Sequence, residues 1–230
     1  MSKAKAWTTD DDTPLPERVL AELEAAEINP GRPVIAVDAD EVLVHFAAHF
    51  NGFLTARGYR FSLSEYRLDN AIFDAAGKAL TRERITPLIW DFIGGETSRQ
   101  PVIEGAAEAL ASLESEGQVI VLTNAPDSVR ADRIANLADH GMNYPVVMNE
   151  GGKGRALRWI AQRAAAPVAF VDDSVAQHAS AAKHAPAVMR FHMVAPEILR
   201  PVMAKAPGAR RVESWAEATP LIRRALAHGV

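Results

Sequence analysis

The sequence predicts an α/β protein in which helices cover both faces of a mainly parallel sheet, giving a three-layer sandwich. Short apolar, β-branched runs alternate with helical patterns over residues 33–193, which is typical of βαβ units. The runs contain few polar positions, as expected of strands that are buried on both faces. A long interval without a strand pattern separates the first two runs and predicts a small helical insertion.

The elements follow in chain order. Residues 1–30 are expected to form an arm with one helical pattern, ERVLAELEAAEI, which ends before Asn29-Pro30-Gly31. The predicted strands are PVIAV (33–37), QVIVL (118–122), PVVM (145–148), PVAFV (167–171) and AVMRFHM (187–193). The helices between them are expected at 105–116, 127–140, 153–165 and 175–184. ESWAEATPLIRRALAHG predicts a closing amphipathic helix.

The interval between the first two strands predicts a second, smaller domain. It contains helical patterns at 45–57 and 82–92 and no convincing strand pattern, and the two glycines in Ile93–Thr97 have the flexibility of a hinge. It is far longer than an ordinary βα loop. We therefore expect residues 31–44 and 101–230 to form the α/β core, and residues 45–100 to form an inserted helical domain.

The amino-acid composition excludes or disfavours several classes of function. The chain has 230 residues, 48% of them hydrophobic and 23% charged, with a net charge of −4, which is ordinary for a globular protein and offers no electrostatic reason to bind a nucleic-acid polymer or an anionic membrane. There is no cysteine, which excludes disulfides and thiol catalysis. With no apolar stretch near its start that resembles a secretory signal, the protein is expected to be cytoplasmic.

Polar side chains gather where the predicted strands end. They are Asp38, Asp40, Thr123, Asn124, Lys153, Asp172 and Asp173. Ligands of open α/β sheets bind beyond the carboxyl ends of the strands, so these side chains are expected to converge. Carboxylates in one cleft repel each other unless a cation neutralises them, and an all-oxygen set of ligands favours Mg²⁺.

The ordered set resembles the four motifs of the haloacid dehalogenase-like hydrolases. The motifs are strand-Asp38-x-Asp40-x-Val-Leu, strand-Thr123, Lys153 and strand-Asp172-Asp173. The resemblance covers residues 33–193 and implies a Rossmann-like core, with residues 45–100 as a cap over the site. It implies hydrolysis of phosphate monoesters, because Asp40 stands where the dehalogenase and phosphonatase branches lack an acid.

The resemblance also implies a role for each catalytic and substrate-binding residue. Asp38 would attack phosphorus and form an aspartyl-phosphate. Asp40 would protonate the leaving oxygen and then activate the hydrolytic water. Thr123 and the backbone N–H of Asn124 would hold the phosphoryl oxygens, and Lys153 would balance the charge of Asp38 and the phosphoryl group.

The metal set implied by the resemblance is Asp38, the main-chain carbonyl of Asp40 and Asp173, with Asp172 in support, around Mg²⁺. One position departs from the family pattern: Glu41 stands where glycine is usual. Its side chain is expected to alter the turn, to add charge near the metal or to point to solvent.

The expected substrate is a small phosphorylated metabolite, because a helical cap would exclude water and contact the leaving group. Three alternatives stay open. A phosphomutase of the same family needs the same residues, and an inactive relative would bind a phosphorylated ligand without turnover. A phospho-receiver domain also uses Asp, Thr and Lys with Mg²⁺, but it would place its acidic pair on the first strand, whereas here the pair comes last.

Overall fold

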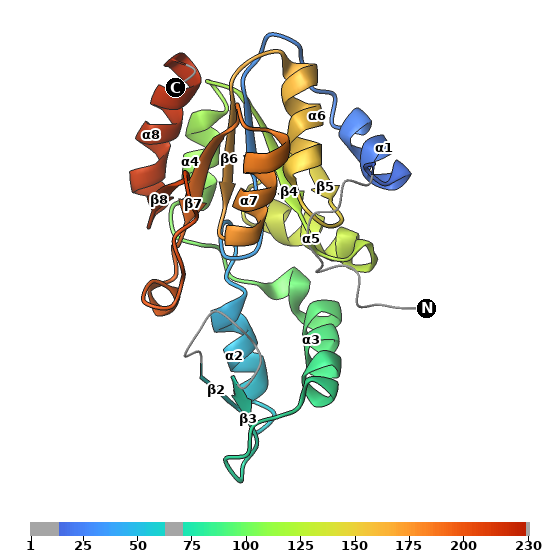
Figure 1. The fold of residues 1–230 in the computed structure, drawn as a ribbon. Helices are drawn as coiled ribbons and strands as arrows, with labels where there is room; N and C mark the ends of the chain where they lie inside the picture. The colour runs from blue at the N-terminus through green and yellow to red at the C-terminus, as the bar shows by residue number, and fades with distance from the viewer. Residues whose placement is uncertain (1–13, 63–70, 229–230) are drawn as a thin grey trace.

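The central sheet has six strands, all paired in parallel. The computed structural model describes residues 14–62 and 71–228, and the sheet has the order β5-β4-β1-β6-β7-β8 (Figure 1). The strands are β1 (Val34–Val37), β4 (Gln118–Thr123), β5 (Val146–Met148), β6 (Val168–Asp172), β7 (Met189–Met193) and β8 (Arg210–Val212). The α/β class is confirmed; β8, only three residues long, was not expected from the sequence.

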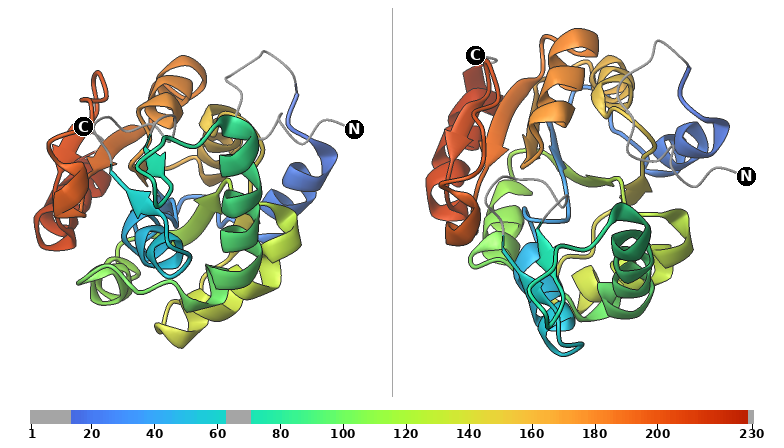
Figure 2. Two further views of the ribbon diagram at one scale, coloured as in Figure 1. Left: turned by 90° about the horizontal axis from the view of Figure 1, so that it is seen from below. Right: turned by 60° about the horizontal axis from the view of Figure 1, so that its bottom comes forward.

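Helices cover both faces of the sheet, as the buried strands require. One apolar cluster contains Ile35 and Val37 of β1, and the other contains Val34 and Ala36, because successive side chains leave a strand on opposite sides. The first face is covered by α4 (Ala106–Leu113), α5 (Arg130–Asp139) and α8 (Trp215–His228), and the second by α1 (Glu17–Ala25), α6 (Gly154–Ala164) and α7 (Val175–His184). Figure 2 shows the two helical layers from further directions.

Strand register brings the polar strand ends to one edge of the sheet. Val37 pairs with Val121 on one side and with Val171 on the other. The chain therefore leaves β1, β4 and β6 at nearly the same level. The residues after these strands face the space below the sheet in Figure 1.

The segment between β1 and α4 forms a separate group of elements at that edge (Figure 1). It contains α2 (Ala47–Thr55), β2 (Arg60–Phe61), β3 (Ile72–Phe73), α3 (Arg82–Glu96) and the 3₁₀ turn η2 (Thr97–Arg99). Its apolar cluster includes Phe50, Phe53 and Phe92, together with Val129 from the 3₁₀ turn η3 (Asp127–Val129). The antiparallel pair β2–β3 corrects the expectation of an interval without strands; two residues a strand are too few to produce a readable alternation.

The two crossings between this segment and the core run side by side. His45 N–H donates to Pro101 O at 2.8 Å, and Ile103 N–H donates to Leu43 O at 2.8 Å. Gly94 and Gly95 were expected to provide a hinge, but both lie inside α3. A glycine costs a helix about 1 kcal/mol relative to alanine without ending it. The chain instead returns to the core through η2 and Gln100.

Helix α1 covers the open edge of the sheet at β5. Glu22 Oε2 accepts a hydrogen bond from Met148 N–H at 2.7 Å, and Arg18 Nη1 donates to Met148 O at 2.8 Å. The expected arm is therefore bound to the core from α1 onwards, and the part of it over residues 1–13 lies outside the described residues. Side chains that occupy edge groups prevent pairing with another strand.

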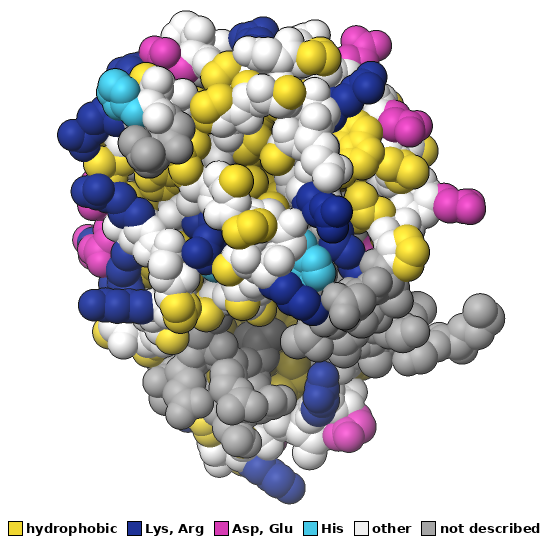
Figure 3. Space-filling view, turned by 45° about the horizontal axis from the view of Figure 1, so that its top comes forward, with side chains coloured by type: hydrophobic (Ala, Val, Ile, Leu, Met, Phe, Trp, Pro, Cys, Tyr) yellow, Lys and Arg dark blue, Asp and Glu magenta, His cyan; other side chains and the backbone are white. Residues whose placement is uncertain are grey.

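The surface carries mixed charge. On the face seen in Figure 3, basic and acidic side chains are interspersed with apolar ones, in keeping with a net charge of only −4. Among the described residues, no helix combines the length and the apolar composition needed to cross a membrane.

Candidate active site

Three carboxylates meet at the carboxyl edge of the sheet. Asp38 directly follows β1, Asp172 ends β6 and Asp173 follows it. One oxygen from each lies within 4.8 Å of the others, and all three side chains are buried. Parallel neighbouring strands therefore bring together residues that are 134 positions apart (172 − 38).

Lys153 provides the positive charge inside this group. Its Nζ lies 2.8 Å from Asp38 Oδ1 and 2.6 Å from Asp172 Oδ2, and only 1% of its side chain is exposed. Burial by itself would lower the pKa of Lys153, but the charges of Asp172 and Asp38 outweigh it and raise that pKa above its usual value. The ammonium is therefore held in its charged form.

Two backbone features place Lys153 there. Its N–H donates to Gln177 Oε1 of α7 at 2.7 Å. The next residue is Gly154, where a Cβ atom would lie 2.1 Å from Ser180 O. Only glycine permits this close approach of α6 to α7. The lysine is thus fixed by helix packing as well as by its ion pairs.

The residues present fit a divalent cation. Burial raises the pKa of Asp38, with the charges of Asp172 and Asp40 adding to it and Lys153 acting against it. Burial likewise raises the pKa of Asp172. Three carboxylates therefore lie close together in a buried place beside one ammonium, and a cation bound by hard oxygen ligands would relieve the repulsion among them.

The hydrogen bonds distinguish the roles of the carboxylates. Asp172 Oδ2 contacts Lys153, and Asp172 Oδ1 accepts from Ser174 N–H at 2.8 Å. Both oxygens of Asp172 are engaged by the protein, so it suits a supporting role. The other two members of the group are Asp38, whose Oδ1 contacts Lys153, and Asp173.

Two histidines behind the acidic pair hold its backbone. His178 Nε2 donates to Asp172 O at 3.0 Å, and His192 Nε2 donates to Asp173 O at 2.8 Å. Burial lowers the pKa of both imidazoles, so they act as neutral donors. The sequence contained no pattern that assigned them this task, because their partners are main-chain carbonyls.

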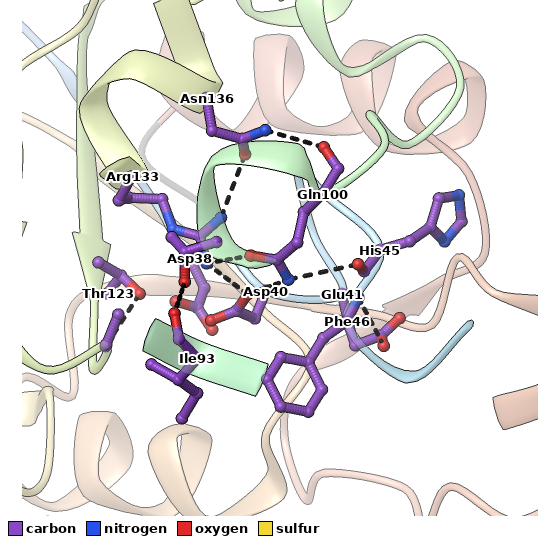
Figure 4. Close-up of polar contacts among 12 residues, drawn as sticks. Asp38, Asp40, Glu41, His45, Phe46, Ile93, Gln100, Thr123, Arg133 and Asn136 are labelled. Atoms are coloured by element: carbon purple, nitrogen blue, oxygen red, sulfur yellow. Dashed lines mark hydrogen bonds and ion pairs between the residues drawn. The ribbon is translucent and has the colours of Figure 1, made fainter. Parts of the chain in front are cut away.

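Thr123 and Asn124 lie where β4 ends, at the same edge. Thr123 is buried, and its Oγ1 accepts from Ala125 N–H at 3.3 Å; Figure 4 shows it on the side of Asp38. The Asn124 side chain donates to Gly151 O at 2.8 Å and accepts from Asn149 Nδ2 at 3.0 Å. It therefore ties the loop after β4 to the loop that carries Lys153.

Asp40 is bound by two residues that lie outside the three-carboxylate group. Its Oδ1 accepts from Arg133 Nη2 of α5 at 2.6 Å and from Gln100 Nε2 at 3.0 Å (Figure 4). Asp40 is not one of the three carboxylates that lie within 4.8 Å of one another, although its charge adds to the raised pKa of Asp38. Its predicted metal contact was through the main chain. Neither partner was predicted from the sequence. In α5, Arg133 is buried while its neighbour Ile134 is 44% exposed, which is the reverse of what their side-chain polarity indicates.

Glu41 neither faces the carboxylate group nor points to solvent. It has a φ of +61°, a conformation that favours glycine, and its side chain is 2% exposed. Its Oε1 accepts from Phe46 N–H at 3.1 Å and from Ala47 N–H at the start of α2. Burial raises the pKa of Glu41 to about 7. Of the three expectations, the altered turn is the one the structure supports, with the carboxyl group used to cap α2.

Comparisons with known proteins identify the fold. No family model and no curated protein sequence matches the chain. Among solved structures, a HAD family hydrolase from Deinococcus radiodurans, solved with bound phosphate and sodium, superposes with a TM-score of 0.59 at 16% identity, covering 86% of this chain and 97% of that one. A subfamily IA HAD hydrolase from Geobacter sulfurreducens gives 0.53 at 18% identity, covering 83% and 99%.

A protein from Thermotoga maritima, provisionally assigned as a β-phosphoglucomutase, gives a TM-score of 0.55 at 15% identity, covering 84% of this chain and 100% of that one. These identities are low, so the likeness concerns the fold. More than four fifths of this chain is covered in each case. The chain has the fold of the haloacid dehalogenase-like hydrolases, the family that its strand-end motifs resemble.

Proposed function

We propose that this protein is a Mg²⁺-dependent hydrolase of small phosphate monoesters that acts through an aspartyl-phosphate on Asp38. The observation that carries the proposal is the placement of Lys153 Nζ 2.8 Å from Asp38 Oδ1, within a group of three buried carboxylates. A carboxylate held beside a fixed ammonium at the end of a strand is oriented for attack on phosphorus. The solved HAD hydrolase from Deinococcus radiodurans, which has bound phosphate, is consistent with this use of the fold.

In the first step, an Asp38 carboxylate oxygen attacks phosphorus and the bond to the ester oxygen breaks. Phosphoryl transfer depends mainly on in-line positioning and on positive charge around the equatorial oxygens. Lys153 supplies one such charge, and Thr123 with the Asn124 N–H supplies neutral hydrogen-bond donors beside it. Bound Mg²⁺ would neutralise further negative charge and would be held by Asp38, Asp173 and the Asp40 carbonyl, with Asp172 supporting.

Asp40 acts as the general acid in the first step and as the general base in the second. It donates a proton to the leaving oxygen as the ester bond breaks, and then takes one from the water that hydrolyses the aspartyl-phosphate. Its side chain is held by Arg133 and Gln100 and is not one of the three clustered carboxylates, which suits a group that exchanges protons rather than one whose side chain ligates metal.

Residues 45–100 would act as the cap of the site, and residues 31–44 and 101–230 as its α/β core. Helix α1, from the predicted N-terminal segment 1–30, covers the sheet edge at β5. The cap assignment is supported by the apolar cluster of the inserted segment, which is centred on phenylalanines, and by the paired crossings at Leu43–His45 and 101–103. A cap at the strand ends restricts the site to small substrates. We expect a cytoplasmic enzyme that acts on a phosphorylated metabolite.

The test is phosphate release from a panel of phosphorylated metabolites with Mg²⁺, measured for the wild type and for Asp38→Asn. We expect turnover by the wild type and its loss, by about 10³-fold or more, in the variant, because an amide is a poor nucleophile. Asp139→Asn, an exposed site near the end of α5, serves as the matched control and should keep full activity. Equal phosphate release by Asp38→Asn would overturn the proposal.

A phosphomutase is the second candidate, favoured by the likeness to the Thermotoga maritima protein. The same residues would form the aspartyl-phosphate and return the phosphoryl group to another hydroxyl of the substrate. Product analysis separates the two, because a phosphatase releases inorganic phosphate whereas a mutase yields an isomeric phosphate ester.

A further inference from the structure

A buried arginine is directed at the side chain of Asp40. Arg133 lies on α5, its side chain is 1% exposed, and its Nη2 is 2.6 Å from Asp40 Oδ1 (Figure 4). Removing a guanidinium from water is costly unless its partners are well placed. Arg133 Nη2 also donates to Gln100 Oε1 at 2.8 Å. The guanidinium of Arg133 therefore binds Asp40 and a residue, Gln100, that itself binds Asp40.

Gln100 completes the arrangement from the other side. It stands where the inserted segment returns to the core, and its Nε2 donates to Asp40 Oδ1 at 3.0 Å and to His45 O at 3.3 Å. Asn136 Nδ2 holds the Gln100 carbonyl at 2.9 Å. Gln100 thus joins Asp40 to both crossings between the core and the inserted segment.

We propose that Arg133 and Gln100 are positioning residues for Asp40, fixing its carboxyl group in the orientation that proton transfer needs. The inference rests on the proposed function. Both donors act on Oδ1, so Oδ2 is the oxygen that neither of them engages and that exchanges the proton. Neither residue needs to touch the substrate, since each acts through Asp40.

The charge of Arg133 also matches the chemistry. As the phosphorus–oxygen bond breaks, its electron pair moves to the leaving oxygen, and the proton on Asp40 Oδ2 moves to the same oxygen. Asp40 is then a carboxylate and forms its full ion pair with Arg133. In the second step this carboxylate takes a proton from water, whose oxygen attacks phosphorus and breaks the bond to Asp38. Arg133 therefore stabilises the form of Asp40 that the first step produces and the second step uses.

The test compares two esters with wild-type, Arg133→Met and Asp40→Asn proteins. One is p-nitrophenyl phosphate, whose leaving group needs little protonation, and the other is the alkyl phosphate that the wild type hydrolyses fastest. General acid–base catalysis contributes about 10²- to 10⁴-fold. We expect Arg133→Met to lower kcat/KM at least about 10-fold more for the alkyl ester than for the aryl ester, the same pattern as Asp40→Asn. In the Asp40→Asn background, Arg133→Met should cause no further loss.

Two further variants keep the test decisive if Arg133→Met does not fold. Arg133→Lys retains a charge and should recover part of the alkyl-ester activity, and Gln100→Met should show the same ester preference to a smaller degree. Arg224→Met, an exposed site on α8, is the control. An equal loss for both esters in these variants, or a loss that adds to that of Asp40→Asn, would overturn the inference. A wild type that releases phosphate from neither ester would instead overturn the proposed function.

Discussion

Lys153 Nζ lies 2.8 Å from Asp38 Oδ1 although the two residues belong to loops after different strands. The contact depends on the parallel order β5-β4-β1-β6, which aligns the carboxyl ends of strands distant in sequence. It also depends on the packing of α6 against α7, which carries the lysine backbone into place. The ion pair is thus a product of the sheet and of one helix pair acting together.

Replacing Lys153 with methionine should damage both activity and stability. The variant leaves Asp38 and Asp172 without their buried cation, and breaking such a pair costs about 3 to 5 kcal/mol. We expect kcat/KM to fall by about 10² or more, with a lower unfolding free energy in urea. Adding Asp172→Asn should restore part of the stability and none of the activity. Lys78→Met, exposed near β3, should change neither, and a Lys153→Met protein of wild-type stability would contradict the buried ion pair.

Mg²⁺ should stabilise the folded protein through Asp173. A ligand that binds only the native state adds about 2.7 kcal/mol at 100 times its Kd, so thermal unfolding with Mg²⁺ should shift upwards by several degrees. The shift should vanish in Asp173→Asn and persist in Asp139→Asn. In parallel, EDTA should abolish phosphate release and added Mg²⁺ should restore it. An equal shift in Asp173→Asn would show that the ion binds elsewhere.

Glu22 should stabilise the protein at neutral pH and lose this effect in acid. Burial would raise the pKa of Glu22, but hydrogen bonds from Arg130, Met148 N–H and Arg18 outweigh it and leave the pKa below its usual value of 4.5. Between the lowered folded value and 4.5 the unfolded chain binds more protons, so stability rises with pH over that window and is fully present above it. Stability is lost again as the pH falls through the folded value.

The measurement is urea unfolding of Glu22→Gln and wild type at pH 7 and below pH 4. We expect the variant to be less stable by about 1 to 2 kcal/mol at pH 7, with the difference shrinking in acid. Glu24→Gln, an exposed neighbour on α1, should match the wild type at both values. A difference independent of pH would indicate that the carboxylate charge has no part in holding the β5 edge.

Replacing Glu41 with glycine should lower the stability of the folded protein less than replacing it with alanine. Both substitutions remove the acceptor for the first N–H groups of α2, a loss of about 0.5 to 2 kcal/mol for a helix cap. Alanine also keeps a Cβ in the left-handed conformation, which costs roughly 1 to 2 kcal/mol more, whereas glycine relieves it. Thermal unfolding of Glu41→Gly and Glu41→Ala checks the order, and equal melting temperatures would mean that the positive φ stores no strain.

Many helices and strands could be predicted from the sequence because their local residue patterns agree with the tertiary structure. The run PVIAV became β1, and the pattern at 175–184 became α7 with the same bounds. β2 and β3 were not predicted because strands of two residues are too short to show a pattern, and β8 was not predicted because two of its three residues are arginines. Gly94 and Gly95 were expected to form a hinge, but α3 continues through both of them as a helix.

For the site, the sequence could predict which polar residues lie at the carboxyl edge of the sheet, because a residue that follows a buried parallel strand emerges at that edge. Asp38, Asp172 and Asp173 were predicted to converge in this way, and the structure places them together with Lys153. That Arg133 and Gln100 hold Asp40, and that Glu41 caps α2, follows from the folded arrangement and has no signal in the sequence. A long side chain on a helix or in a crossing can reach many partners, and burial in the assembled fold selects among them.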